Sequence, residues 1–435
     1  MNRVFKVGIG FATGRKNFQR VLKSYIYNWK ESGLVDSRRV SLNLFVAYDL
    51  SYHNTLKTDY TPVSPEISSL VDSQHFIGKN EVEEAKAFLT QNRVLNGEEA
   101  ESLFGKGYAA QRNIVLYRAI RSGMDCLLFL DDDEYPVAVT NTRNQAVWGG
   151  QQVLKEHLEN IENADITFGH HCGYISPIPR LDFDDVLPER EFRLFIEAIS
   201  NDIISWKRMK TVMANGGVTY ADTRILMNKP VAEVPEVNAC KFIAGSNLCI
   251  NLTDPKRVFP FYNPPGARGE DTFLSTCLGA RKVLRVPCYT FHDGFSGYHH
   301  LLAGVLPIEL KPVAARSEQI VKRFQRACLG WIRYKPLLLY ITDRAAYPQR
   351  IEEMTDQLSR TLPLLCRYFN TDEFMSVLKE LRRYDVMVQK HYEQFQAVKA
   401  GWARLMRFYI QEAERPALAG AGTSPLGPAP ARAGG

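Results

Sequence analysis

A five-residue apolar run, Cys126 to Leu130, leads directly into four consecutive acids, Asp131 to Glu134. An uninterrupted apolar run of this kind is typical of a strand buried on both faces in an α/β sheet. Ligand clefts in such sheets lie beyond the carboxyl ends of the strands, and Pro136 prevents the strand from continuing there. Side chains alternate along an extended chain, so the first and third acids should point the same way. This arrangement predicts a site for a hard divalent cation, Mg²⁺ or Mn²⁺.

Strand and helix signals alternate along the first half of the chain, which predicts an α/β fold with a mostly parallel sheet flanked by helices. Capping and glycine patterns support the helix ends, for example Asn80 with Glu83 and the Gly123 turn. The expected strands are 4–11, 40–48, 75–77, 126–130, 165–168, 242–251 and 282–291, and the expected helices are 17–32, 80–92, 97–104, 108–122 and 189–213.

The bulk composition sets the broad class. The chain has 435 residues, 45% of them hydrophobic and 23% charged, and a net charge of +6, so it can bury a large core. Neither a basic run nor an aromatic-basic stripe dominates, which disfavours nucleic acid as a partner. No apolar run approaches the roughly 18 residues of a membrane span, and the first residues lack the core of a signal peptide. We therefore expect a cytoplasmic protein without a transmembrane segment.

The pattern becomes helical from about Ala314, which predicts a domain boundary there. We expect a catalytic domain at 1–313 with halves of about 1–136 and 137–313, a helical region at 314–415 and a disordered Ala/Gly/Pro-rich tail at 416–435. One long helix packing on the catalytic domain is favoured over a coiled coil that forms a homodimer, because Asp385 and Lys399 interrupt the second series of core positions. The segment 331–341 could contact the inner membrane face, although such a segment is more often buried. The apolar positions recurring at sevens are Phe374, Leu381, Val388, Phe395, Trp402 and Tyr409.

The residues around the acidic turn carry a resemblance. Gln111-Arg112-Asn113 and Ala119 precede Asp131–Asp133 on a helix that follows Gly105-Lys106-Gly107. In this respect residues 4–300 resemble the GT-A fold glycosyltransferases, especially the broad family-2-like group with its Asp-x-Asp motif. The resemblance implies a Rossmann-like sheet with a nucleotide-sugar half first and an acceptor half second. Alternatively, Arg112 forms a surface ion pair. The acids could likewise form a solvated loop, a calcium site or the motif of a phosphatase, and Tyr135 disfavours the phosphatase motif.

The resemblance also implies roles for individual residues, each with a plainer alternative. The first strand ends would contact the nucleoside, although Asp49 could equally be a turn residue. Glu270-Asp271 looks like the family's Glu-Asp motif, with Asp271 as the catalytic base and Glu270 beside it, unless both merely favour a helix N-terminus. His170 and His171 could line the acceptor side or form a turn. The residues implied to bind the sugar donor are Phe11, Ala12, Thr13, Asp49, Lys106, Arg112, Asp131, Asp132 and Gly245.

By the same resemblance, His292 at the end of a late strand would complete a metal site with Asp133 and Asp131. A mixed imidazole and carboxylate site would suit Mn²⁺ somewhat better than a site made only of oxygens. The implied activity is transfer of a sugar from a nucleoside-diphosphate sugar to a hydroxyl acceptor, non-processive and inverting. A retaining transferase, a metal-dependent phosphate-ester hydrolase and a non-catalytic sugar-nucleotide binding module are the alternatives. All of these expectations require Asp133 and His292 to lie close together beside a cavity.

Overall fold

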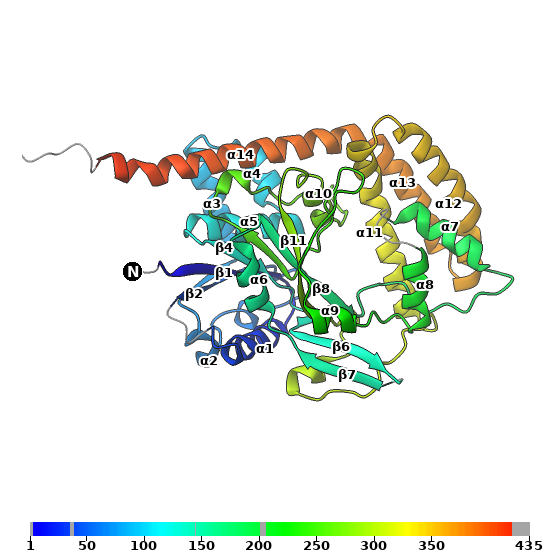
Figure 1. Cartoon of the computed structure of the whole chain (residues 1–435). Helices are drawn as coiled ribbons and strands as arrows, with labels where there is room; N and C mark the ends of the chain where they lie inside the picture. Colours follow the sequence, from blue (N-terminus) through cyan, green and yellow to red (C-terminus); the bar gives the residue numbers. More distant parts are fainter. Residues whose placement is uncertain (1–2, 35–38, 144, 201–205, 420–435) are drawn as a thin grey trace, which may run out of the picture.

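The computed structural model of this chain describes residues 3–34, 39–143, 145–200 and 206–419, with side chains described as far as residue 412. Within these residues a nine-stranded sheet forms the centre, and a separate hairpin lies beside it (Figure 1). The strands of the sheet are β1 (Phe5–Thr13), β2 (Val40–Tyr48), β3 (Ser73–Ile77), β4 (Cys126–Phe129), β5 (Glu134–Tyr135), β8 (Ile166–Gly173), β9 (Ala232–Glu233), β10 (Leu248–Asn251) and β11 (Val283–His292), and those of the hairpin are β6 (Val137–Thr142) and β7 (Gln145–Gly150).

Helices cover both faces of the sheet, because its strands are apolar on both sides. Along β2, Leu42 and Leu44 enter one core, whereas Phe45 and Ala47 enter the other. The first core is covered by α1 (Phe18–Glu31), α2 (Pro65–Ser68), α6 (Val153–Ile161) and α9 (Thr223–Asn228). The second is covered by α3 (Lys79–Gln91), α4 (Gly97–Phe104), α5 (Tyr108–Arg121), α7 (Glu189–Ile199), α8 (Trp206–Ala214) and α10 (Glu270–Ser275). Short 3₁₀ turns are η1 (Lys57–Asp59), η2 (Pro255–Arg257), η3 (His299–Ala303) and η4 (Asp372–Met375).

The sheet is mixed, which corrects the expectation of a mostly parallel one. Its order is β3-β2-β1-β4-β10-β8-β11-β5, with β9 paired to β11 outside this path. The first four strands are parallel, and so are β8 and β11. β10 enters antiparallel between β4 and β8, and β5 and β9 are antiparallel to β11. A single crossover helix enforces parallel pairing, whereas the long path from β8 through α7, α8 and α9 lets the chain return from the opposite end.

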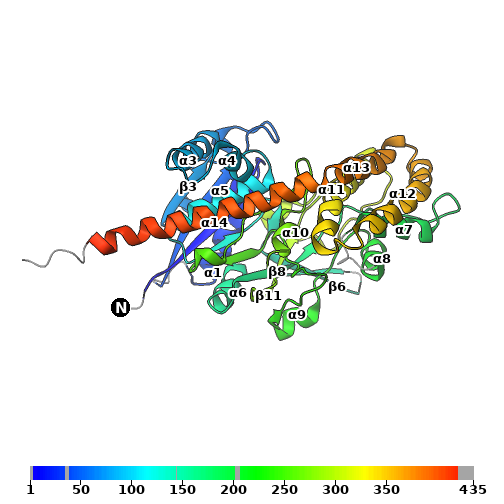
Figure 2. The same ribbon diagram turned by 90° about the horizontal axis from the view of Figure 1, so that it is seen from above.

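The C-terminal part consists of the helices α11 (Glu318–Thr342), α12 (Tyr347–Phe369), α13 (Ser376–Val386) and α14 (Val388–Ala419). The expected single helix over 374–409 is therefore broken between α13 and α14. Its apolar positions nevertheless pack within the chain, because Leu381, Phe395 and Trp402 belong to the same core as α3 to α5. α14 runs back across α4, as Figures 1 and 2 show. The first residues of the expected tail, 416–419, are helical, and 420–435 lie outside the described residues.

Two expected elements differ from the prediction. The helix expected over 189–213 is divided into α7, which ends at Ile199, and α8, which covers Trp206–Ala214. α7 ends there because Ser200 is extended and its carbonyl accepts a hydrogen bond from Lys335, and 201–205 lie outside the described residues. The strand expected over 242–251 begins only at Leu248. Asn247 has a left-handed backbone with φ of 49°, which a strand does not accommodate. The six residues before β10 therefore lie in a loop and not in the sheet, and they can contribute side chains and carbonyl groups to a site.

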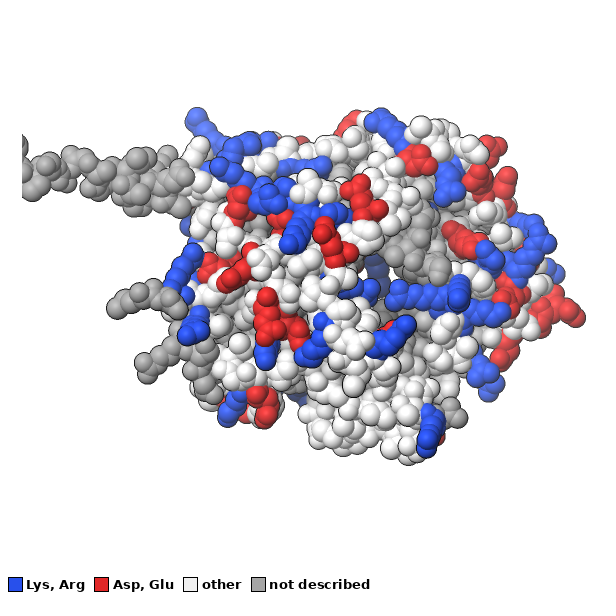
Figure 3. All heavy atoms as spheres, viewed as in Figure 1, with Lys and Arg blue, Asp and Glu red and all other residues white. Residues whose placement is uncertain are grey.

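The distribution of apolar and charged side chains on the surface tests the expected contact with a membrane. In α11, the segment 331–341 contains Ile332, Leu337 and Leu339, which are all buried, so it offers no continuous apolar face to a membrane. Among the described residues, no helix is long and apolar enough to cross a membrane. Acidic and basic side chains are interspersed over the face shown in Figure 3, and its lower part, over the β6–β7 hairpin, carries few charges.

Candidate functional site

The acidic turn lies directly beyond β4, and sheet pairing brings it to the end of β11. After Asp131–Asp133 the chain forms β5, in which Glu134 pairs opposite His292. The backbone N–H of Asp293 also donates a hydrogen bond of 2.9 Å to the carbonyl of Asp133. The sheet itself therefore holds the tip of the central strand against the end of a strand that comes about 150 residues later in the chain.

Asp133 and His292 form an ion pair at this junction, so the expected proximity is confirmed. His292 Nε2 lies 3.4 Å from Asp133 Oδ2, while Nδ1 lies 3.1 Å from the carbonyl oxygen of Tyr174. A carbonyl can only accept, so Nδ1 carries a proton and Nε2 faces the carboxylate. Burial lowers the pKa of His292, but attraction by Asp133 outweighs it and raises the pKa to about 9. Burial opposes ionisation of Asp133, yet His292 and Arg15 hold its pKa well below the usual range.

Arg15 is a site residue that the sequence analysis missed. Its guanidinium lies 2.6 Å from Asp132 Oδ1 and 2.7 Å from Asp133 Oδ2, and thus bridges two of the three aspartates. Thr13 donates a further hydrogen bond to Asp132. The signal that could have found it is a cation two residues beyond the end of β1, the strand parallel to β4. Parallel neighbours end at the same edge of the sheet, so side chains just past both ends meet.

The side chains at this edge fit a divalent cation only with help from a substrate. No group of three or more His, Cys, Asp or Glu side chains suited to a metal occurs in the described residues. Asp133 would supply one oxygen ligand, and His292 would supply one nitrogen ligand once its Nε2 proton is displaced. The bond from Nδ1 to the Tyr174 carbonyl orients the ring as in many metal-binding histidines. Mg²⁺ and Mn²⁺ commonly bind through one or two protein groups, with water and phosphate oxygens in the other positions. The donor set therefore fits such a cation bound together with a phosphate ligand.

A cleft of about 810 Å³ opens above these residues and is lined by both halves of the sheet. It contains most of the residues expected to bind a sugar donor or a metal, together with Glu270, one of the two expected catalytic residues. The lining donor-binding and metal-binding candidates are Ala12, Thr13, Asp49, Lys106, Asp131, Asp132, Asp133 and His292. Tyr52 and Arg268 also line it and were not predicted. Asp49 lines the cleft and is a turn residue as well, because its Oδ1 accepts hydrogen bonds from the backbone and hydroxyl of Ser51. Phe11 lies below the cleft, fully buried against Phe18.

Arg112 lies beneath the cleft and not in it. Its side chain is only 2% exposed, and Nη2 lies 3.0 Å from Asp131 Oδ1. It also donates a hydrogen bond to the carbonyl of Gly245, and its guanidinium contacts the rings of Tyr108 and Phe129. The surface ion pair considered from the sequence is therefore wrong, and direct contact with a phosphate is blocked by burial. Arg112, itself bonded to the Gly245 carbonyl, instead fixes Asp131. The pKa of Asp131 is raised by burial and lowered by Arg112, for a net rise to about 6.

The Glu-Asp pair begins α10, and its two members face differently. Glu270 lines the cleft and lies 3.6 Å from Arg112 Nε. Asp271 is not among the lining residues, and its Oδ1 accepts a 2.8 Å hydrogen bond from the backbone of Thr272. Burial and the adjacent Asp271 raise the pKa of Glu270 to about 7, against the attraction of Arg112. Because it lines the cleft, Glu270 is better placed than Asp271 to take a proton from a ligand bound there.

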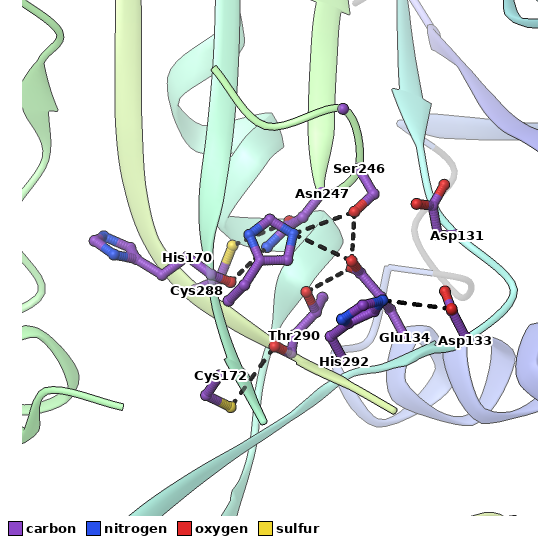
Figure 4. Close-up of polar contacts among 12 residues, drawn as sticks. Asp131, Asp133, Glu134, His170, Cys172, Ser246, Asn247, Cys288, Thr290 and His292 are labelled. Carbon is purple, nitrogen blue, oxygen red and sulfur yellow. Dashed lines mark hydrogen bonds and ion pairs between the residues drawn. The ribbon is translucent and has the colours of Figure 1, made fainter. Parts of the chain in front are cut away.

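Glu134, the fourth acid, is the centre of a buried hydrogen-bond cluster (Figure 4). It accepts hydrogen bonds from Ser246 at 2.6 Å and from Thr290 at 2.7 Å, and His171 Nε2 lies 3.3 Å away. Burial alone would raise its pKa, but His171, His292 and Ser246 lower it to about 2. His171 belongs to β8 and not to a turn, while its neighbour His170 stacks on Tyr289. The cluster fixes the loop before β10 onto the acidic turn.

Comparison with known proteins adds no relative to this picture. No protein-family model matches the chain, and no curated protein matches it either.

Proposed function

We propose that the protein is a metal-dependent glycosyltransferase, which moves a sugar from a nucleoside-diphosphate sugar to a hydroxyl group of an acceptor. The observation that carries the proposal is the Asp133–His292 pair, facing a cleft whose walls come from both halves of the sheet. A bound cation would neutralise charge on the departing diphosphate. The GT-A resemblance of the acidic turn and of the Glu-Asp pair supports the same assignment.

The residues divide between the two substrates. A nucleoside and its phosphates would bind to lining residues at the ends of the first strands and before α5. Thr13 ends β1, Asp49 follows β2, and Lys106 lies in the loop between α4 and α5. The carboxylate of Asp131, held by Arg112, would accept hydrogen bonds from hydroxyls of the transferred sugar. The cleft of about 810 Å³ has room for a ligand of this size.

In the reaction, the acceptor oxygen bonds to the anomeric carbon while the bond from that carbon to the diphosphate oxygen breaks. The electron pair of the broken bond leaves with the nucleoside diphosphate, and the proton of the acceptor hydroxyl passes to a carboxylate. Glu270 takes this role, because it lines the cleft and its pKa of about 7 is close to neutral pH. Attack opposite the leaving group inverts the configuration. We further propose that the enzyme transfers one sugar per acceptor, without processive addition, and that the cation is Mn²⁺.

A panel of nucleotide sugars, assayed with Mn²⁺ for nucleoside diphosphate release, tests the proposal. Release that depends on the sugar nucleotide and increases with a glycan acceptor supports transfer. Inorganic phosphate released from simple esters would indicate a hydrolase, and tight binding without turnover would indicate a binding module. Asp133→Ala should abolish Mn²⁺-dependent nucleotide binding. Glu270→Gln should retain binding and lose turnover, and the exposed Glu352→Gln is the matched control.

A further inference from the structure

Arg323 brings the C-terminal helical region to the candidate site. It lies on α11, and its guanidinium stacks over the Phe295 ring, 4.2 Å from the centroid. A methyl group on Gly294 would lie 2.9 Å from Arg323 Nη2 and 3.1 Å from His292 Cε1. The guanidinium and the imidazole thus both lie against the backbone of Gly294. The absence of a side chain at Gly294 permits this approach.

The Arg323 guanidinium lacks a bonded anionic partner among the residues that the structure describes. It forms no ion pair or hydrogen bond with another residue in the described part of the chain, although it is half-buried. Asp133, the carboxylate that attracts Arg323 most, is already bonded to Arg15 and His292. Burial lowers the pKa of Arg323, and Arg268 and Arg15 lower it further, against the attraction of Asp133 and Asp293. A cation held in this way among other cations is costly unless an anion joins it.

Arg268 is a second guanidinium without a partner in the described part of the chain, and its charge lowers the pKa of Arg323. It lines the cleft, is exposed, and forms no ion pair or hydrogen bond within the described residues. Its aliphatic stem packs along α11, where a methyl group on Gly330 would lie 3.2 Å from Arg268 Cδ. α11 therefore positions both guanidiniums, one as its own side chain and the other through the packing of its stem.

We propose that Arg323 and Arg268 form an anion subsite beside the Asp133–His292 pair, which binds a phosphate or carboxylate group of a substrate. The inference rests on the proposed function for the identity of that substrate. Two sources carry this chemistry: the diphosphate of the sugar donor and an anionic group on the acceptor. Two guanidiniums offer paired N–H groups that match either oxyanion. The helical region then contributes directly to substrate binding, which the resemblance does not imply.

Calorimetric titration of the full chain with inorganic pyrophosphate and Mn²⁺, and separately with inorganic phosphate, tests the subsite without any turnover. Arg323→Gln and Arg268→Gln should each weaken the binding of at least one of these anions by about tenfold or more. Arg323→Lys keeps the charge but not the fork and should give a smaller loss. Arg326→Gln, an exposed arginine on the same helix, is the control and should bind like the wild type. Because Arg268 is exposed, its variant tests the subsite even if Arg323→Gln fails to fold.

The two sources separate when the titration is repeated with UDP or GDP. Weaker nucleoside diphosphate binding in both variants assigns the subsite to the sugar donor. Unchanged nucleotide binding, with loss of phosphate binding to the nucleotide-saturated protein, assigns it to an anionic acceptor. Wild-type affinity for every anion in both variants overturns the subsite, and so does a wild type that binds none of them. The proposed function fails by a different result, which is no sugar-nucleotide turnover in the wild type.

Discussion

Replacing Glu134 with Gln should destabilise the protein by about 3 kcal/mol at pH 7. Gln has the shape of the protonated acid, so the substitution removes the charge and little else. The pKa of Glu134 is lowered from 4.5 to about 2, and one pH unit corresponds to about 1.4 kcal/mol, which gives the figure of about 3 kcal/mol. A count of the contacts agrees with this figure. The interactions of Glu134 with Ser246, Thr290 and His171 should each contribute roughly 1 kcal/mol less to stability when the carboxylate is replaced by a neutral amide.

The sign of the pH dependence follows from the lowered pKa. The stabilisation by Glu134 is fully present above the unfolded-state pKa near 4.5 and is lost as the pH falls through the folded-state pKa near 2. Wild type and Glu134→Gln should therefore differ most above pH 4.5 and converge below it. Urea unfolding followed by tryptophan fluorescence at a series of pH values measures the difference from the midpoint and the slope.

Glu352→Gln, in an exposed part of α12, is the control and should change the free energy of unfolding by less than about 0.5 kcal/mol. A Glu134→Gln protein as stable as the wild type at pH 7 would refute the reasoning. So would a difference that stays constant from pH 7 to pH 3, because it would come from packing and not from the carboxylate charge.

Two further predictions test other parts of the structure. If Glu270 is the catalytic base, kcat/KM should fall about tenfold per pH unit below a pKa of about 7, because protonation removes the base. Glu270→Gln should abolish this acidic limb of the pH profile. A wild-type kcat/KM that does not change with pH would contradict the assignment. Trp402→Ala should lower the free energy of unfolding in urea by about 3 to 5 kcal/mol, because the ring is 1% exposed and Nε1 donates a 3.0 Å hydrogen bond to the Val258 carbonyl. A loss under about 1 kcal/mol would show that α14 packs only loosely.

The sequence predicted those features that depend on local patterns. The apolar run before Asp131 marked β4, and strand-helix alternation predicted the parallel half of the sheet, with β2 and α4 at the expected residues. The proximity of Asp133 and His292 was also anticipated, but only as what the resemblance of the acidic turn to the GT-A fold enzymes implies. The predicted strands and helices needed no information on how distant segments pack.

The sequence did not predict features that depend on partners far along the chain. Arg112 points inward because Asp131 and the Gly245 carbonyl, 133 residues away, receive its hydrogen bonds. α7 ends at Ile199 where Lys335 of α11 bonds the next carbonyl. Arg15 and Arg323 enter the site by tertiary packing, and a lone arginine carries no periodic signal. The reversal of β10 has the same origin, since neighbouring strands and not its own residues determine its direction.

The position of α14 has a consequence for synthesis of the chain. Arg404 bonds Glu99 across 305 residues, and the small Gly401 lets α14 lie against Leu95 and Leu103. Until α14 leaves the ribosome, the apolar side of α3 and α4 lacks this cover. Contacts this distant in sequence form slowly. Nascent and truncated chains therefore expose an apolar surface, which favours aggregation or binding by chaperones. Fragments that end before α14 should accordingly be recovered mainly in the insoluble fraction.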